Sequence, residues 1–229
     1  MEKKIDIHHI FWYFIIFSIV GLMIETIFCY ATTGVIESRK GLLWGPFCPI
    51  YGVGAVVLIC LLEPYKDKDW KILLYGGVLG SAVEYILSFA LEAMYSSRFW
   101  DYSHLSFNLN GRICITYAIY WSVLSVILMK YITPWIDEHI DKISARKKAV
   151  AEKVLLLFLM IDVIATVWAI ITYKDRALDM YYQRMQEKKD EILEKIEENY
   201  FTNERMMQTF PNLRVQLEDG TEKFIRDIL

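Results

Sequence analysis

The sequence predicts an all-α fold, a polytopic membrane helical bundle followed by a polar, mostly helical C-terminal tail. Composition supports this class, because 55% of the 229 residues are hydrophobic, 15% are aromatic and the mean hydropathy is +0.28. The apolar residues also form runs of roughly 20 residues, the length of a helix that crosses a bilayer. Most of the last quarter of the chain, in contrast, is polar and charged.

Five runs are predicted to be transmembrane spans, at residues 10–30, 47–62, 72–91, 113–133 and 154–173. The run at 47–62 is the shortest, and prolines and glycines such as Pro49 and Gly52 interrupt its first half. Since these residues break regular helices, a bent or re-entrant helix is the alternative to a full crossing at this run. The expected domains are therefore a transmembrane domain over residues 1–173 and a tail over residues 174–229.

Apolar residues of the tail recur at helical spacing as far as about Phe201, which predicts a partly amphipathic helix. After Pro211, apolar and polar residues alternate, and Asp219-Gly220 is typical of a tight turn. This pattern is compatible with a small β-hairpin, and a terminal helix over residues 222–229 is an equally open alternative.

The distribution of Lys and Arg predicts the orientation in the membrane. These residues are more frequent at the N-terminus and in the second and fourth loops than in the first and third loops. Basic loops remain preferentially in the cytoplasm, so the N-terminus is expected to be cytoplasmic. With five spans, the loops around Trp44 and Trp100 and the C-terminal tail are then extracytoplasmic.

Ionisable residues within the apolar runs are the first candidates for function. A charge in hydrocarbon is costly unless it faces a partner, a cavity or the interior of a bundle. Glu25 lies about 22 Å along the first span and Glu84 about 18 Å along the third, so both fall in the outer half. Arg112 begins the fourth span from the same side and is expected to provide their positive partner, with interfacial snorkelling as the alternative. Asp162, in the fifth span, is either a relay residue or a packing residue that accepts hydrogen bonds.

Small residues accompany both glutamates at helical spacing. One face of the third span contains Gly76, Gly80, Glu84 and Ser88. In the first span, Ser18, Gly21 and Glu25 share a face in the same way. Such stripes allow helices to approach closely and would place a neighbouring helix beside each carboxylate. No repeat between the two halves of the chain is evident from the sequence.

The outer segments before the second and fourth spans contain polar and aromatic residues that suggest a binding mouth. Alternatively, they are an aromatic belt with capped helix starts. The predicted binding pocket combines these residues with the intramembrane charges: Glu25, Glu84, Asp101, Tyr102, Asn108, Asn110 and Arg112, with Asp162 as the candidate relay.

No catalytic residue, metal site, cofactor or nucleic-acid partner is predicted. The four cysteines are dispersed without CxxC spacing and are expected to be buried free thiols, although a disulfide between Cys48 and Cys114 is an alternative. The histidines lack metal-ligand spacing with the acids, and no nucleophile–base pair is recognisable.

The segments GPFCPIYGVG, FWDYS and FNLNGRICI resemble motifs of the bacterial putative ABC-transporter type IV (CmpB-like) membrane proteins. The resemblance covers roughly residues 10–135 and implies a multi-pass protein of the bacterial cytoplasmic (inner) membrane that acts as a transporter permease. No GxxxxGK[ST] phosphate-binding loop is present, so the expected partners are the lipid bilayer, a separate ATP-binding subunit, and a homodimer or hetero-oligomer.

Two alternatives to transport remain at this point. One is an intramembrane enzyme in which Glu25, Glu84 or Asp101 acts as general acid or base and Arg112 holds a lipid-linked substrate. The other is a non-catalytic membrane scaffold protein that binds a partner through its tail.

Overall fold

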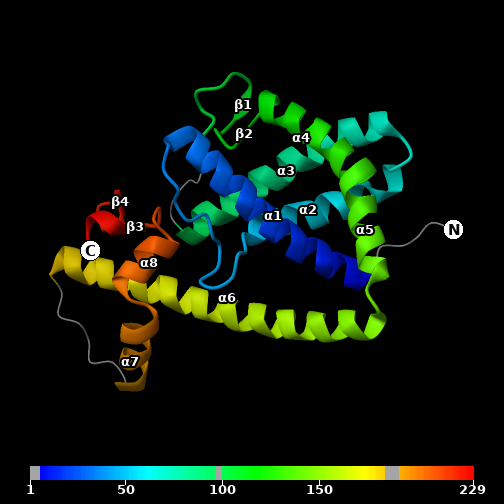
Figure 1. Cartoon of the computed structure of the whole chain (residues 1–229). Helices are drawn as coiled ribbons and strands as arrows, with labels where there is room; N and C mark the ends of the chain where they lie inside the picture. Colours follow the sequence, from blue (N-terminus) through cyan, green and yellow to red (C-terminus); the bar gives the residue numbers. More distant parts are fainter. Residues whose placement is uncertain (1–5, 96–99, 184–190) are drawn as a thin grey trace.

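The structure of the chain, a computed structural model, describes residues 6–95, 100–183 and 191–229 (Figure 1). It is a bundle of α-helices with two short hairpins, which confirms the predicted all-α class. Along the bundle the helices are α1 (Ile7–Thr33), α2 (Pro49–Leu62), η1 (Glu63–Tyr65), α3 (Asp69–Tyr95), α4 (Ile115–Ile127), η2 (Leu128–Ile132), α5 (Thr133–Lys142) and α6 (Ala145–Tyr182).

Four helices of the described chain are long and apolar enough to cross a membrane, namely Ile7–Thr33, Asp69–Ala93, Ile115–Lys142 and Ala145–Tyr182. They correspond to four of the five predicted spans. The third of these is continuous through the π-helical turn η2 into α5. The remaining predicted span, at 47–62, is a shorter apolar helix that covers Pro49–Tyr65 together with η1.

The short helix α2 begins beside the middle of α1. The backbone N–H of Cys48 donates to the carbonyl oxygen of Ser18 over 2.9 Å, and Ser18 lies about 17 Å along α1. Before this point the chain returns alongside the second half of α1 without helical structure, and its residues Leu42, Leu43 and Phe47 are buried. Non-helical backbone at membrane depth requires such protein cover. The segment therefore consists of a buried non-helical stretch followed by a helix shorter than the four that are long enough to cross a membrane.

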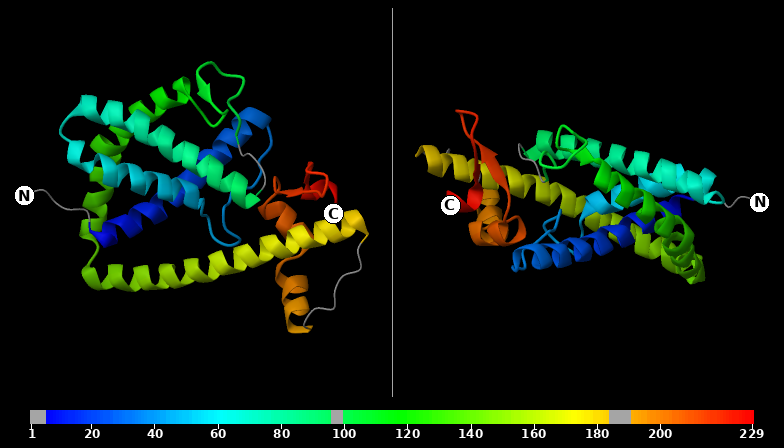
Figure 2. Two further views of the ribbon diagram at one scale, coloured as in Figure 1. Left: turned by 180° about the vertical axis from the view of Figure 1, so that it is seen from behind. Right: turned by 90° about the horizontal axis from the view of Figure 1, so that it is seen from above.

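Polar contacts join α1 to the start of α6 and to α5 at one end of the bundle. Glu152 accepts hydrogen bonds from Trp12 Nε1 over 2.8 Å and contacts His8 Nδ1 at 2.6 Å. The Tyr13 hydroxyl donates to Asp137. The loops around residues 34–48 and 100–114 lie at the other end with the tail (Figure 2). The two ends thus contain the same sets of loops that the distribution of Lys and Arg had grouped together.

The tail packs onto the last third of α6, which continues to Tyr182, past the predicted end of the fifth span. Helices α7 (Glu191–Tyr200) and α8 (Asn203–Thr209) precede a short hairpin formed by β3 (Arg214–Gln216) and β4 (Glu222–Phe224). The helical turn η3 (Ile225–Asp227) follows. Of the two alternatives for this segment, the hairpin is therefore the one observed. The expected helix at the start of the tail falls partly on residues 184–190, which lie outside the described residues.

A common apolar core joins the tail to the membrane bundle. Met206 and Ile225 are fully buried and belong to one cluster with Ala169 and Tyr173 of α6 and Leu43 of the first loop. At the rim of this core, Asn212 Nδ2 donates to Glu37 Oε2 over 3.1 Å. The tail is thus folded against the same end of the bundle as the first loop.

Candidate functional site

The glycine stripe of α3 packs directly against α4, as predicted. A Cβ atom at Gly76 would lie 2.4 Å from Ser125 Cβ, and one at Gly80 would lie 2.5 Å from Trp121 Cγ. These distances leave no room for a side chain. Close approach of the two helices is what brings the Trp121 indole to Glu84, one turn beyond Gly80.

Glu84 is a buried carboxylate, 8% exposed, that neutral donors hold. Trp121 Nε1 donates to Glu84 Oε2 over 3.0 Å, and the Tyr102 hydroxyl donates to Oε1 over 2.9 Å. Within the described part of the chain, no Lys or Arg lies at ion-pair distance from this carboxylate. Among the described residues, the carboxyl group therefore has neutral hydrogen-bond donors around it and no cation beside it.

Tyr102 comes from the outer loop and closes the site over Glu84. Its ring stacks on Tyr117 of α4, with centroids 4.4 Å apart. Burial raises the pKa of Tyr102 above its ordinary value, and the neighbouring Glu84 carboxylate adds to this effect. The phenol therefore stays protonated at neutral pH and acts as a donor.

Glu25 has a related but more open environment on α1. It is partly exposed and accepts a hydrogen bond from the Tyr51 hydroxyl of α2. The Tyr51 ring packs against Gly21, where an added Cβ would lie 2.2 Å from Tyr51 Cβ, and Ser18 packs against Gly52 in the same way. The predicted face of α1 is thus the face that contacts α2.

Arg112 does not pair with either of these glutamates. Its Nη1 donates to Ser88 Oγ over 2.9 Å, and its Nη2 forms an ion pair with Glu92. The guanidinium is 5.8 Å from the centroid of the Tyr85 ring and is buried, so it does not snorkel. Arg112 therefore lies on the same face of α3 as Glu84, but its charge is matched by a glutamate two turns further along.

The other predicted residues of the outer loop shape the loop itself. Asp101 Oδ1 accepts from Ser103 N over 2.9 Å, and Asn108 Oδ1 accepts from Gly111 N over 3.0 Å. Asn110 has a positive φ of 54° and donates from Nδ2 to the Tyr85 hydroxyl over 3.0 Å. These contacts form the short hairpin of β1 (Asn108–Leu109) and β2 (Ile113–Cys114), which positions Tyr102 and Arg112.

Asp162 is completely buried and anchors the extended stretch of the first loop. Its Oδ1 accepts a hydrogen bond from the Trp44 backbone N–H over 3.0 Å and from Thr166 Oγ1 over 3.3 Å. Thr166 Oγ1 in turn accepts from Leu43 N over 2.8 Å. The geometry is that of a packing residue, since it satisfies backbone groups that the bilayer would leave without partners. The second oxygen, Oδ2, has no hydrogen-bond partner among the described residues.

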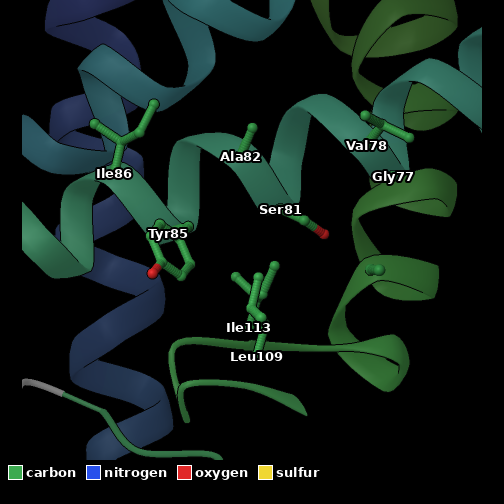
Figure 3. A pocket seen from close by; sticks show the side chains of 9 residues that line it. Gly77, Val78, Ser81, Ala82, Tyr85, Ile86, Leu109 and Ile113 are labelled. Carbon is green, nitrogen blue, oxygen red and sulfur yellow. The ribbon is translucent and has the colours of Figure 1, made fainter. Parts of the chain in front are cut away.

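The described surface has an apolar groove with a volume of about 490 Å³ (Figure 3). It lies between α3 and the β1–β2 hairpin, and Ser81, Tyr85, Leu109 and Ile113 line it. None of the predicted pocket residues is among its lining. The groove is therefore separate from Glu84, and the polar pocket remains a prediction.

Two residues of the glutamate clusters were not singled out from the sequence as site residues. Tyr51 lies inside the GPFCPIYGVG segment, and Trp121 lies within an apolar run that offers no signal for its indole N–H. The spacing of the stripes predicted that a helix would lie beside each carboxylate. It did not reveal which side chain of that helix would donate. No group of His, Cys, Asp or Glu in the described chain could hold a metal ion, and the four cysteines are free thiols.

Fold and site together define a multi-pass helical membrane protein with a buried carboxyl group, that of Glu84, held by two neutral donors near one end. Residues 12–167 match the family described as Putative ABC-transporter type IV. This match covers more than half of the chain, so the protein belongs to that family and is an ABC-type transport-associated membrane protein. No curated protein and no solved structure matches the chain.

Proposed function

We propose that this chain is the permease-like subunit of an ABC-type transport system in the bacterial cytoplasmic membrane. We further propose that Glu84, with its donors Tyr102 and Trp121, is the ligand site. The observation that carries the proposal is the burial of Glu84 against Tyr102 and Trp121, with no Lys or Arg of the described residues at ion-pair distance. A buried carboxylate in this state is costly and is stabilised by any ligand that brings positive charge. Intramembrane carboxylates of this kind typically mark ion and substrate pathways.

The orientation proposed is the one that Lys and Arg predict, with the N-terminus in the cytoplasm. Tyr102 and the outer loop then form the extracytoplasmic cover of an outward-facing pocket over Glu84. The tail lies on the same side. ATP hydrolysis is assigned to a separate ATP-binding subunit, and a homodimer or hetero-oligomer would complete a pathway that so few spans leave incomplete.

The test is purification of the full chain from its native membrane in mild detergent, followed by reconstitution with its partners in proteoliposomes. We expect an ATP-binding subunit to co-purify. We further expect Glu84→Gln to lower ATP turnover at least about tenfold while the complex remains assembled. Glu63→Gln, at the opposite end of the bundle, is the control and should leave ATP turnover unchanged. The absence of an ATP-binding subunit, or normal turnover in Glu84→Gln, would contradict the proposal.

A scaffold role is the second candidate, because α7 presents apolar side chains to solvent. Near the two ends of α7, Ile192 is 69% exposed and Tyr200 is 54% exposed. Deletion of residues 191–229 distinguishes the two roles. A scaffold loses a co-purifying partner on this deletion but not in Glu84→Gln.

A further inference from the structure

Two helices of the bundle begin with the same local structure. A glycine in the left-handed region precedes each of them, with φ of +69° at Gly45 and +68° at Gly111. Three residues later, Cys48 is the N-cap of α2 and Cys114 is the N-cap of α4, and both thiols are buried. The chain thus enters both helices through one pattern, a left-handed glycine followed by a buried cysteine cap.

The long helices that precede these caps also correspond. α1 and α3 contain 27 residues each and begin at the same end of the bundle (Figure 2). Both carry the pattern Gly-x-x-x-Glu, as Gly21 to Glu25 and as Gly80 to Glu84. In both, the glycine packs against an aromatic side chain of the next helix, and an aromatic side chain of that helix donates to the glutamate.

A contact between the paired helices is repeated as well. When Glu25 is aligned with Glu84 and Cys48 with Cys114, Ser18 corresponds to Gly77 and Gly52 corresponds to Ala118. A Cβ atom at Gly52 would lie 2.3 Å from Ser18 Oγ, and one at Gly77 would lie 3.0 Å from the Ala118 carbonyl oxygen. The corresponding positions are therefore in contact within each helix pair, although in the second pair Ser122 Oγ lies nearer to the added Cβ, at 2.3 Å.

We infer that residues 7–62 and 69–127 are two copies of one hairpin unit, and that Glu25 and Glu84 are equivalent sites that bind the same small monovalent cation. The inference deepens the proposed function and rests on it for the assignment of Glu84 as a ligand site. Since α1 and α3 begin at the same end, the units are parallel repeats. In transporters with such repeats, the ligand sites lie where the repeats meet.

The ligand class follows from the groups that face the two carboxylates. Tyr102 and Trp121 face Glu84, and Tyr51 donates to Glu25, with Cys48 within electrostatic reach. All of these groups are uncharged as donors, so each site retains the negative charge of its glutamate. Aromatic faces add a further attraction for a cation.

The two units differ in how the carboxylate is covered. In the first, Tyr51 reaches Glu25 directly. In the second, Tyr117 occupies the position that corresponds to Tyr51, and Tyr102 is inserted between it and Glu84. Glu84 is accordingly the more buried of the two. We expect the same ion at both sites, with slower exchange at Glu84.

The experiment is carbodiimide labelling of the full chain in lipid nanodiscs, with the modified carboxyl groups located by peptide mass spectrometry. Sodium, potassium and choline are the probes, each added as chloride at constant ionic strength. We expect Glu25 and Glu84 to be modified, and one of these ions to slow both reactions by at least about fivefold. Glu92, which Arg112 holds, is the internal control and should react slowly whichever ion is present.

Variants keep the inference falsifiable if one site collapses. Glu84→Asp retains the carboxylate, and labelling of Glu25 in Glu84→Gln reports on the first unit alone, with circular dichroism to verify the fold. Modification of only one glutamate or of neither, protection by different ions, or no protection by any of them overturns the inference. If the same ion protects both residues but no ATP-binding subunit co-purifies, the transport role fails and the equivalence stands. If an ATP-binding subunit co-purifies but no single ion protects both glutamates, the equivalence of the two sites fails and the transport role stands.

Discussion

The end of the bundle with the N-terminus and the surroundings of Glu84 treat charged groups differently. At the end with the N-terminus, charges lie beside opposite charges: Lys130 pairs with Asp69, and His9 Nε2 lies 3.3 Å from Asp141 Oδ1. Near the other end, Arg112 and Glu92 also form an ion pair, but the donors to Glu84 among the described residues are the neutral groups of Tyr102 and Trp121. Paired charges of the first kind fix helices relative to one another, whereas an uncompensated carboxylate favours ligand binding. The comparison indicates which carboxylates hold the structure together and which are available for function.

The largest expected effect comes from the packing that positions Glu25. Gly21→Ala would place a Cβ 2.2 Å from Tyr51 Cβ, so we expect a loss of about 3 kcal/mol in the free energy of unfolding. Gly54→Ala is the matched control in α2, because its Cβ would meet only Val83 Cγ1 at 3.8 Å. The control should be neutral or more stable by about 0.5 kcal/mol. Chemical unfolding in detergent micelles measures both, and equal stabilities would contradict the close approach.

Substitutions of Asp162 test whether this intramembrane carboxylate serves packing or is the predicted relay residue. If it serves packing, Asp162→Ala leaves the Trp44 N–H without its acceptor and costs about 2 kcal/mol. Asp162→Asn keeps an acceptor oxygen and should cost less than about 1 kcal/mol. Both stabilities can be measured by unfolding in micelles. Transport that is lost in Asp162→Asn at normal stability would instead favour the predicted relay.

The smallest effect concerns a carboxylate at the charged end, Asp6, which caps α1. Partial burial acts to raise its pKa, but hydrogen bonds from His9 N and Nδ1 outweigh this and hold the pKa below its ordinary value. A lowered pKa stabilises the folded helix start above the ordinary value, and the stabilisation is lost as pH falls through the folded pKa. Asp6→Ala should therefore speed amide hydrogen exchange in the first turn of α1 at neutral pH. The variant and the natural chain should converge as the pH falls through the folded pKa of Asp6. A difference that persists in acid would contradict this.

Much of the fold could be predicted from the sequence, because a bilayer imposes length and hydropathy on every helix that crosses it. The short second helix was harder to predict. Its cover comes from Thr166 and Asp162, which are far away in the sequence, and this cover allows an extended stretch to lie beside α1. Local pattern alone contains no information about such distant contacts.

The candidate site was predicted in part for a similar reason. The stripes predicted which faces of α1 and α3 meet a neighbour, since small residues at helical spacing have a direct packing consequence. The prediction that Arg112 pairs with Glu25 or Glu84 was wrong, since its partner is Glu92. Glu84 and Glu92 lie on one helical face, and the loop conformation decides which of them the guanidinium reaches. The repeat that we infer is not evident from the sequence, because the segment between the glutamate and the cysteine cap is longer in the second unit than in the first.

A double-mutant cycle on Arg112 tests the central distinction most directly. The free energy of unfolding in micelles is measured for Arg112→Gln alone, combined with Glu92→Gln, and combined with Glu84→Gln, alongside the single glutamate variants. We predict a coupling energy of about 1–2 kcal/mol between Arg112 and Glu92, and additive effects, within about 0.5 kcal/mol, for Arg112 and Glu84. Strong coupling between Arg112 and Glu84 would show that the arginine compensates this carboxylate, and would contradict the account.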